Sequence, residues 1–464
     1  MIAAENNFTD NATKNGAQTL IVGLGATGLS CARFLHERGE TFTLIDNRPE
    51  PPALEQLHSE MPEVQAVCGS FDAPVMQTAQ RIVLSPGISL REPPIAAALQ
   101  RGAEILGDIE LFARYVAAPV VAITGSNGKS TVTSIVGEMA RAAGLNVSVG
   151  GNIGTPALDL LRSAEQRTDY YVLELSSFQL ETTRSLNAYA AVVLNISPDH
   201  MDRYDSVEEY AAAKQGVYQG DGILVINRDD PRVVAMESEV LRQNPQRRVI
   251  RFTLQSPQQQ EYGVLCTDGE QWLALGENRL LNINELRIAG QHNQANALAA
   301  LALGEAMHLP MNVMLDVLRE FPGLPHRTQW VASIDGVNWY NDSKGTNVGA
   351  TVAAVAGMPG SKVLIAGGDG KGADFSPLKA MAMHHGVKAV VLIGRDGPAI
   401  AKALDAAVPV HFAADMLDAV KQANDLAAPG DCVLLSPACA SFDMFANYVE
   451  RGKVFEQAVK GMAT

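Results

Sequence analysis

The feature that most constrains this chain is a glycine loop between a buried apolar run and an apolar-periodic helix. The run begins after Pro119, and the loop reads Thr-Gly-Ser-Asn-Gly-Lys-Ser-Thr from Thr124 to Thr131. In such a loop, backbone N–H groups surround phosphates, a lysine pairs with terminal phosphate oxygens and a hydroxyl binds Mg²⁺. The spacing is two residues shorter than the common form, so the loop is a variant. The sequence predicts an α/β domain that binds ATP through Gly125, Ser126, Asn127, Gly128, Lys129, Ser130 and Thr131.

Length and charge narrow the class of protein. The 464 residues suggest about three domains, and 47% hydrophobic with 19% charged residues can build several cores. The formal net charge of −15 disfavours nucleic acid and membranes as partners. The composition indicates a soluble globular protein, and we separately expect it to be a monomer. Five widely spaced cysteines without a Cys-x-x-Cys pair are typical of a reduced, cytoplasmic protein. Residues 1–18 are expected to form a disordered polar tail, and no segment has the roughly 18 apolar residues of a membrane-spanning helix.

A second glycine motif lies near the start of the chain. Gly23, Gly25 and Gly28 form G-x-G-x-x-G between an apolar strand and a helix, and Asp46 stands near the ribose-binding position of a dinucleotide fold. Because glycines at a helix N-terminus suit any pyrophosphate, the motif leaves three options open: a dinucleotide, another nucleotide diphosphate, or packing alone. Residues 19–107 are expected to form this Rossmann-like domain.

Strands that end in polar residues before a helix recur through the rest of the chain. Residues 108–323 are expected to form a central P-loop ATPase-type domain, with a small β-rich insert at about 248–286. A loop with two prolines and a glycine at 321–327 is a candidate hinge. Residues 324–464 are expected to form a second Rossmann-like domain. The predicted fold class is therefore α/β with three domains.

Nine motifs, in order, resemble those of the Mur ligases. With the first glycine motif they cover the chain from about Leu20 to Gly452. They are TGSNGKST, GGNIGTP, ELSSFQLE, DHMDRY, GQHNQANALAA, GLPHR, NDSKGTN, GGDGKGADF and SPACASFD. The motifs together are most similar to those of the family members that add D-glutamate, and the last motif, SPACASFD, is the one that most distinguishes these members from their relatives.

The resemblance implies an ATP-dependent amide ligase of cytoplasmic peptidoglycan precursor synthesis. ATP would phosphorylate the carboxylate of UDP-N-acetylmuramoyl-L-alanine, and the amine of D-glutamate would attack the acyl phosphate, releasing ADP and phosphate. The attack of a carboxylate on the γ-phosphate of ATP brings several negatively charged groups together. The site therefore needs cations and precise positioning of the reactants more than covalent catalysis. Lys129 and two Mg²⁺ ions are expected to supply the positive charge.

The expected metal ligands are Ser130, Glu174, His200 and Lys214. Glu174 and His200 are each expected to end a buried strand, and Mg²⁺ prefers oxygen, so His200 keeps an alternative as a structural histidine. Lys214 alone would be a solvated helix lysine, but the resemblance implies a carbamylated lysine that binds Mg²⁺. The expected catalytic residues are Lys129, His200, Lys214 and Asn152.

The resemblance also assigns the substrates to residues along the whole chain, although helix capping is an alternative for several of them. Asn293 and Asn296 share one helix face, and two lysines with hydroxyl donors suit a dicarboxylic amino acid. Tyr448 and Gly345 stand where phenylalanine and alanine are common in the family. The assigned residues are Thr27, Asp46, Arg48, Ser85, Gly87, Asn152, Ser176 and Ser177 for the sugar nucleotide; Asn296, Arg327 and Asp342 for ATP; and Lys344, Thr346, Lys371, Ser441 and Tyr448 for D-glutamate.

Other functions stay open from the sequence. Another amide ligase of the same family, or a folylpolyglutamate-type ligase, would carry the same phosphate loop. An NAD-dependent oxidoreductase would use the first glycine motif, but no hydride-transfer residues accompany that motif. A regulatory module would bind ATP without turnover. Phosphate release that depends on D-glutamate would separate these functions.

Overall fold

The structure is a computed structural model that describes residues 19–162, 167–201, 203–288, 290–358 and 360–462. The polar tail expected at residues 1–18 lies outside this described part. The described chain divides into two compact units. The first unit comprises the residues up to Thr253 with Gln260–Tyr262 and Ala299–Met314, and the second comprises Leu254–Gln259, Gly263–Leu298 and the residues from Leu315 onward.

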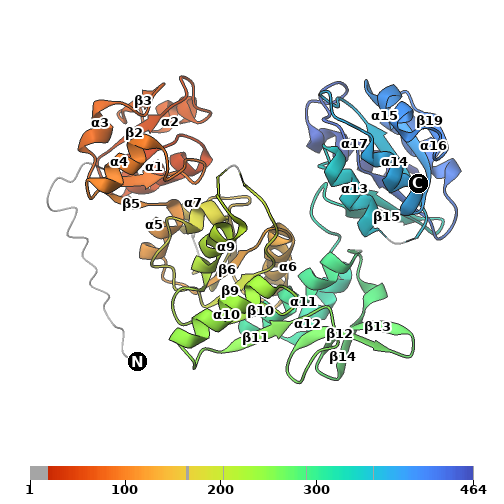
Figure 1. Cartoon of the computed structure of the whole chain (residues 1–464), viewed down its shortest axis with the longest axis horizontal. Coiled ribbons are helices and arrows are strands. Elements are labelled where there is room, and N and C mark those ends of the chain that lie inside the picture. The colour runs from red at the N-terminus through yellow and green to blue at the C-terminus, as the bar shows by residue number, and fades with distance from the viewer. Residues whose placement is uncertain (1–18, 163–166, 202, 289, 359, 463–464) are drawn as a thin grey trace. The chain divides into compact units, whose positions relative to one another are not determined.

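The first sheet contains five parallel strands in the order β3-β2-β1-β4-β5. Figure 1 labels β2, β3 and β5 of this sheet with its helices α1 to α4. Its central strand is buried along its whole length, as expected for a parallel sheet with helices on both faces. The strands are β1 (Thr19–Val22), β2 (Phe42–Asp46), β3 (Ala66–Cys68), β4 (Arg81–Leu84) and β5 (Glu104–Leu106), and the helices are α1 (Ala26–Glu37), α2 (Leu54–Glu60), α3 (Pro74–Thr78) and α4 (Pro93–Gln100).

The second sheet has nine strands in the order β14-β13-β12-β11-β10-β9-β6-β8-β7. Parallel pairing runs from β7 through β8, β6, β9 and β10 to β11, so the carboxyl ends of these strands meet at one edge. The strands are β6 (Val120–Thr124), β7 (Val147–Gly151), β8 (Tyr170–Glu174), β9 (Ala190–Val193), β10 (Ile223–Asn227), β11 (Val249–Phe252), β12 (Tyr262–Thr267), β13 (Glu270–Leu275) and β14 (Asn278–Asn282). The predicted β-rich insert is confirmed as β11–β14.

Three helices in the chain segment that carries the second sheet contact its strands: α6 contacts β6, β7 and β8, α7 contacts β7, and α10 contacts β10. The helix α1 contacts α5 and α7, and one apolar cluster runs through residues of both the first and the second sheet. The helical segments are α5 (Asp108–Tyr115), α6 (Lys129–Ala142), α7 (Ala157–Arg162), α8 (Ser177–Leu180), α9 (Val207–Gln215), η2 (Gly216–Tyr218), α10 (Pro231–Gln243), η3 (Ile283–Glu285), α11 (Gln291–Ala306) and α12 (Met311–Glu320).

The third sheet has six strands in the order β15-β16-β20-β17-β18-β19. Only the β15–β16 pair is antiparallel, and the remaining pairs are parallel. The predicted α/β class with three sheet-containing domains is therefore confirmed. The elements are β15 (Gln329–Ile334), β16 (Val337–Asn341), β17 (Lys362–Gly367), β18 (Val387–Ile393), β19 (Val410–Phe412), β20 (Cys432–Leu435), α13 (Val348–Gly357), α14 (Pro377–His384), α15 (Gly397–Leu404), α16 (Met416–Leu426) and α17 (Tyr448–Met462).

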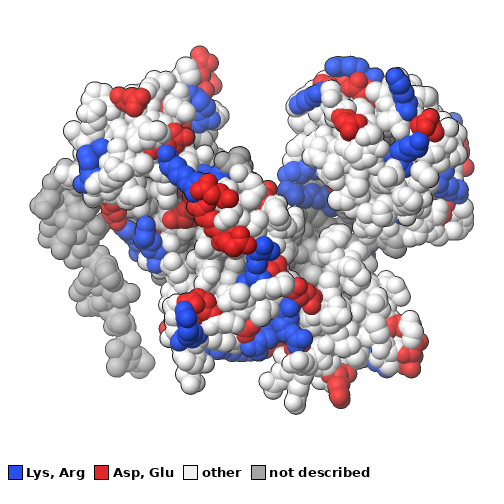
Figure 2. All heavy atoms as spheres, viewed as in Figure 1, with Lys and Arg blue, Asp and Glu red and all other residues white. Residues whose placement is uncertain are grey.

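The surface charge is mixed. Figure 2 shows basic and acidic side chains interspersed across the face that it displays. Among the described residues, no helix combines the length and the apolar character needed to cross a membrane.

Candidate functional site: a phosphate loop and its neighbours

The phosphate loop has the backbone shape that its glycines predict. Gly125 has a φ of +149°, and a Cβ there would lie 2.9 Å from the Cβ of Leu194. Gly128 is the N-cap of α6 with a φ of +85°, in the left-handed region that favours glycine. The Nζ of Lys129 donates to the carbonyl oxygens of Gly125 (2.9 Å) and Ser126 (3.0 Å), so the lysine folds over its own loop. Ser130 and Thr131 follow in the first turn of α6.

The segment after β9 holds this loop from the other side. The N–H of Ser197 donates to the Oγ of Ser126 at 2.9 Å, and the N–H of Asn127 donates to the Oδ1 of Asn195 at 2.9 Å. Asn195 also donates from its Nδ2 to the carbonyl of Asn127 (3.1 Å). These hydrogen bonds between distant segments hold the loop in position. The sequence contains no motif that predicts Asn195 as a partner of the loop.

His200 is placed differently from the sequence prediction. The prediction that it ends a buried strand is wrong, because β9 ends at Val193 and the chain beyond it is held by the phosphate loop instead of by a neighbouring strand. His200 has a φ of +55°, its side chain is 46% exposed, and its ring lies 4.7 Å from that of Phe178. An exposed imidazole is accessible to a ligand, but strand geometry does not orient it.

Lys214 is buried beneath the phosphate loop. It lies on α9, only 1% of its surface is exposed, and its Nζ donates to the Oγ1 of Thr124 at 3.3 Å. Burial, together with the nearby charge of Lys129, lowers the pKa of Lys214 to about 7, although Asp199 and Glu174 act in the opposite direction. The reading of Lys214 as a solvated helix lysine is therefore excluded, and a large fraction of its amine is neutral at neutral pH.

Glu174 is the last residue of β8, so it lies at the carboxyl edge of the second sheet, where the phosphate loop follows β6. Its side chain is almost fully buried. Its Oε1 accepts a hydrogen bond from the Nδ2 of Asn152 at 2.7 Å, whereas its Oε2 is buried without a hydrogen-bond partner among the described residues. A buried carboxylate oxygen without a donor suits a cation. The described residues contain no cluster of three or more His, Cys, Asp or Glu that could hold a metal ion alone. Mg²⁺ commonly takes few carboxylates together with phosphates and waters, so Glu174 and the hydroxyl of Ser130 fit it.

The first glycine motif forms a tight turn after β1. A Cβ at Gly28 would lie 1.8 Å from the carbonyl oxygen of Gly23, and the Oγ of Ser85 donates to that same oxygen at 3.0 Å. Thr27 lies in the first turn of α1, and Gly87 follows β4 in the turn that Ser85 begins. The turns after β1 and β4 thus come together at the carboxyl edge of the first sheet.

Asp46 ends β2 and supports this turn. It is 2% exposed, and its carboxylate accepts hydrogen bonds from the N–H of Leu24 (2.7 Å) and from the Nε (2.8 Å) and Nη2 (2.6 Å) of Arg48. Burial acts to raise the pKa of Asp46, but the donors of Arg48 and Leu24 outweigh it and the pKa is lowered. Asp46 is therefore an ionised anchor for the glycine turn and for the half-exposed Arg48.

Ser176 and Ser177 lie at the start of α8. The Oγ of Ser176 accepts from the N–H of Gln179 at 3.2 Å, and the Oε1 of Gln179 accepts from the N–H of Ser176 at 3.0 Å. This is a capping box, so the capping alternative holds for Ser176. Ser177 is buried in the first helical position.

The residues assigned to the amino acid come from three loops and one helix of the second unit. Lys344 and Thr346 follow β16, Lys371 follows β17, Ser441 follows β20, and Tyr448 begins α17. The strands β16, β20 and β17 are neighbours, so these loops leave the same edge of the sheet. The Nζ of Lys344 lies 5.6 Å from the ring centroid of Tyr448, and the Nζ of Lys371 lies 5.2 Å from that of Phe442. The structure brings this predicted set together.

Asp342 and Arg327 lie at the start of the same region. Asp342 is buried, and its carboxylate accepts from the N–H of Thr328 (3.0 Å) and the Oγ of Ser436 (2.7 Å). Burial raises the pKa of Asp342 to about 6, although Ser436, Thr328 and the exposed Arg327 act to lower it. Asn296 lies on α11, as predicted with Asn293 on one face, and its Nδ2 donates to the Oδ1 of Asn293 at 3.1 Å.

The raised pKa of Asp342 predicts a pH-dependent stability difference. Between pH about 4 and 6 the folded state holds a proton that the unfolded state has released, so ionisation of Asp342 destabilises the fold as the pH rises through this range. We expect Asp342→Asn to raise the calorimetric melting midpoint of the second unit by a few degrees at pH 7.5, with the difference closing near pH 4.5. Asp335→Asn, in an exposed turn, is the control. A shift that does not vary with pH would contradict this account.

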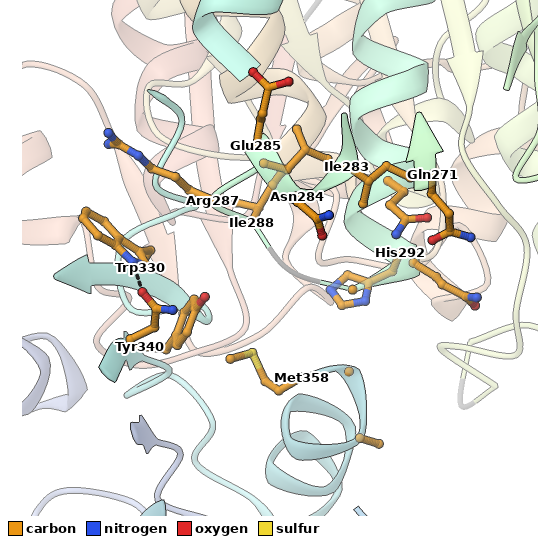
Figure 3. Close-up of a pocket in the computed structure, with 17 residues that line it drawn as sticks. Gln271, Ile283, Asn284, Glu285, Arg287, Ile288, His292, Trp330, Tyr340 and Met358 are labelled. Carbon is orange, nitrogen blue, oxygen red and sulfur yellow. Dashed lines mark hydrogen bonds between the residues drawn. The ribbon is translucent and has the colours of Figure 1, made fainter. Parts of the chain in front are cut away.

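A pocket of about 1030 Å³ lies elsewhere in the second unit (Figure 3). Trp330, Tyr340, His292 and Met358 face it, and Trp330 donates from Nε1 to the Oδ1 of Asn338. None of the predicted site residues lines this pocket. The candidate site is therefore identified from the residues of the phosphate loop, because this pocket does not coincide with them.

Comparison with known proteins agrees with this geometry. Three family models match the chain in order: the Mur ligase MurD-like N-terminal domain at residues 17–107, the Mur ligase middle domain at 123–304 and the Mur ligase glutamate ligase domain at 326–439. The chain belongs to the Mur ligase family. The resemblance predicted from the nine motifs is confirmed.

Similar curated proteins carry one common name. A protein of Nitrosococcus oceani, named UDP-N-acetylmuramoylalanine--D-glutamate ligase, is 54% identical over 446 residues, covering 96% of each chain. A protein of the same name from Marinobacter nauticus is 52% identical and covers 96% of this chain and 98% of the relative. Among solved structures, UDP-N-acetylmuramate-alanine ligase MurC from Thermotoga maritima matches with a TM-score of 0.54 at 16% identity, over 96% of this chain and 99% of the other. This structural likeness supports the fold.

Proposed function

We propose that this chain is an ATP-dependent ligase that joins D-glutamate to UDP-N-acetylmuramoyl-L-alanine in peptidoglycan precursor synthesis. The observation that carries the proposal is the phosphate loop, with its own Lys129 and the buried Lys214 and Glu174 beside it. The near-full-length relatives that share the D-glutamate ligase name support the choice of substrates. We further propose that the protein acts in the cytoplasm as a monomer.

The proposed chemistry begins at the phosphate loop. The N–H groups at the start of α6 and the Nζ of Lys129 would bind the phosphates of ATP, and Lys129 would leave the carbonyls of Gly125 and Ser126 to do so. The substrate carboxylate would attack the γ-phosphorus, forming a C–O–P bond as the bond to the bridging oxygen of ADP breaks. The neutral amine of D-glutamate would then attack the acyl carbon, and the amide would form as the acyl C–O bond breaks, phosphate leaves and the nitrogen loses a proton to solvent. Each step needs alignment and neutralisation of negative charge.

Mg²⁺ would lower the charge on the phosphate oxygens. We propose that Ser130 and the buried Oε2 of Glu174 hold it, with Asn152 orienting Glu174. The exposed imidazole of His200 is proposed as a further ligand. A second ion would use a carbamate on Lys214. The lowered pKa supports this modification, because carbamylation requires a neutral amine to attack CO₂ and then release a proton.

The two substrates would occupy the edges of separate sheets. The glycine turn anchored by Asp46, with Thr27, Arg48, Ser85 and Gly87, would take the uridine and pyrophosphate of the sugar nucleotide. The loops after β16, β17 and β20 would take D-glutamate, whose two carboxylates match Lys344 and Lys371. Asn296, Arg327 and Asp342 would contact ATP.

A phosphate-release assay tests the proposal. With ATP, Mg²⁺ and UDP-N-acetylmuramoyl-L-alanine present, we expect phosphate release to depend strictly on D-glutamate. L-Glutamate, L-lysine and D-alanyl-D-alanine are the matched alternatives, and each is expected to give only background. Equal rates with L-glutamate would contradict the proposed specificity. A change in nicotinamide absorbance without phosphate release would instead favour an oxidoreductase.

A further inference from the structure

One buried cation in the second unit has no part in the chemistry proposed above. Arg451 lies on α17 and is 0% exposed. Its guanidinium donates from Nε to the Oγ of Ser343 (3.0 Å), from Nη2 to the carbonyl of Ser343 (2.8 Å) and from Nη1 to the carbonyl of Cys439 (3.1 Å). These three acceptors are neutral groups, and they lie on two different loops.

These contacts tie together the loops that carry the residues assigned to the amino acid. Ser343 directly precedes Lys344, and Cys439 lies two residues before Ser441. The Oγ of Ser343 also donates to the carbonyl of Tyr448 at 2.7 Å, so the first turn of α17 joins the same network. The guanidinium thus connects the loop after β16, the loop after β20 and the helix that presents Tyr448.

The third loop, after β17, is fastened to the same network. Asp369 and Ala440 exchange two backbone hydrogen bonds of 2.9 Å. Gly368 has a φ of +132°, and a Cβ there would lie 2.3 Å from the carbonyl oxygen of Ala440 and 3.3 Å from the Nη1 of Arg451. Only glycine allows this close approach. Lys371 is therefore carried by a loop whose base contacts the loop that Arg451 holds.

Arg451 forms no ion pair among the residues that the structure describes. The carboxylates of Asp443 and Asp342 favour its charge without bonding to it. Burial lowers the pKa of Arg451 to about 10, so it stays protonated at neutral pH. An arginine buried without a carboxylate is costly for the free protein, whereas a dicarboxylate bound above it would supply the opposing charge.

We propose that Arg451 is a positioning residue for the amino-acid substrate: it sets the geometry of the loops bearing Lys344, Lys371 and Ser441, and it attracts the carboxylates of that substrate. This inference rests on the proposed function. It assigns to Arg451 an action through its neighbours, since none of its donors is exposed to a ligand.

The test compares Arg451→Lys, Arg451→Met and Ser343→Ala in the full chain. Arg451→Lys keeps the charge but cannot reach three acceptors, and Ser343→Ala keeps the arginine while it removes one hydroxyl partner. We expect KM for D-glutamate to rise about tenfold or more in Arg451→Lys, further in Arg451→Met, and by a smaller factor in Ser343→Ala. KM for ATP and for UDP-N-acetylmuramoyl-L-alanine should stay within about twofold. Lys460→Met, an exposed position on the same helix, is the matched control.

The outcomes separate this inference from the proposed function. If wild type shows no phosphate release that depends on D-glutamate, the proposed function fails, and the inference fails with it. If wild type is active but Arg451→Lys and Ser343→Ala leave KM for D-glutamate unchanged, or raise all three KM values alike, only the positioning role is overturned. Should Arg451→Met not fold, the other two variants still decide the question.

Discussion

Replacement of Lys129 by alanine is expected to lower turnover by about a thousandfold, which is the upper end of the effect of removing one preorganised charged donor from a reacting group. Its Nζ already lies at the phosphate loop, bound to the carbonyls of Gly125 and Ser126, so it reaches phosphate without a large movement. The variant should be measured by phosphate release at saturating ATP and again at limiting ATP.

The same substitution should leave the affinity for the sugar nucleotide largely unchanged. The turn anchored by Asp46 belongs to the first sheet, whereas Lys129 follows β6 of the second sheet. Calorimetric titration of UDP-N-acetylmuramoyl-L-alanine provides the measurement. Arg141→Ala, at the exposed end of the same helix, is the control and should retain full turnover. A parallel loss of sugar-nucleotide affinity would contradict the assignment of the two ligands to separate sheets.

Replacement of Lys214 by alanine is expected to lower turnover by at least about a hundredfold, because it removes a group buried against the phosphate loop. If Lys214 carries a carbamate, a short carboxylate such as formate or acetate should restore part of the activity by entering the space that the side chain leaves. Lys402→Ala, on the exposed face of α15, should neither lose activity nor respond to carboxylate.

The pKa of Lys214 predicts how carbamylation depends on pH. Since the pKa of Lys214 is about 7, the amine is mainly neutral at pH 8 and mainly protonated at pH 6. Carbamylation needs the neutral form, so wild-type activity after removal of bicarbonate should return more completely at pH 8 than at pH 6. Intact-protein mass should increase by one CO₂ under the same conditions. A bare amine in an active enzyme, together with no rescue by carboxylate, would overturn the carbamate proposal.

Local sequence was sufficient for the phosphate loop. The left-handed Gly128 and the helix that follows depend on neighbours in the chain, so the pattern of glycine, lysine and serine after an apolar run already predicts them. The glycine turn after β1 and the pairing of Asn293 with Asn296 on one helix face follow from the same kind of short-range geometry. The close approach of Gly125 to Leu194 is different, because it joins segments that are distant in the chain.

Where packing decides, the sequence was less informative. A polar ending after an apolar run suggested that His200 closes a strand, but β9 ends earlier, since the segment that follows it bonds to the phosphate loop. Asp46 stood at the position of a ribose ligand, yet most of its bonding capacity goes to Leu24 and Arg48. In the first case the segment before His200 bonds to the distant phosphate loop instead of extending the strand. In the second case the hydrogen bonds from Leu24 and Arg48 use oxygens of Asp46 that the motif assigns to a ribose.

The sequence by itself determined the three-domain α/β class, the phosphate loop and the family, because these depend on periodicity and on short motifs whose geometry is local. Only the tertiary structure decided that Lys214 is a buried amine with a pKa of about 7, since its partner Thr124 is 90 residues away and α9 packs against α8. It alone placed Arg451 under three loops, because the sheet makes β16, β20 and β17 neighbours although they are far apart in the chain. Desolvation and charge coupling depend on distances in space, which residue order does not specify.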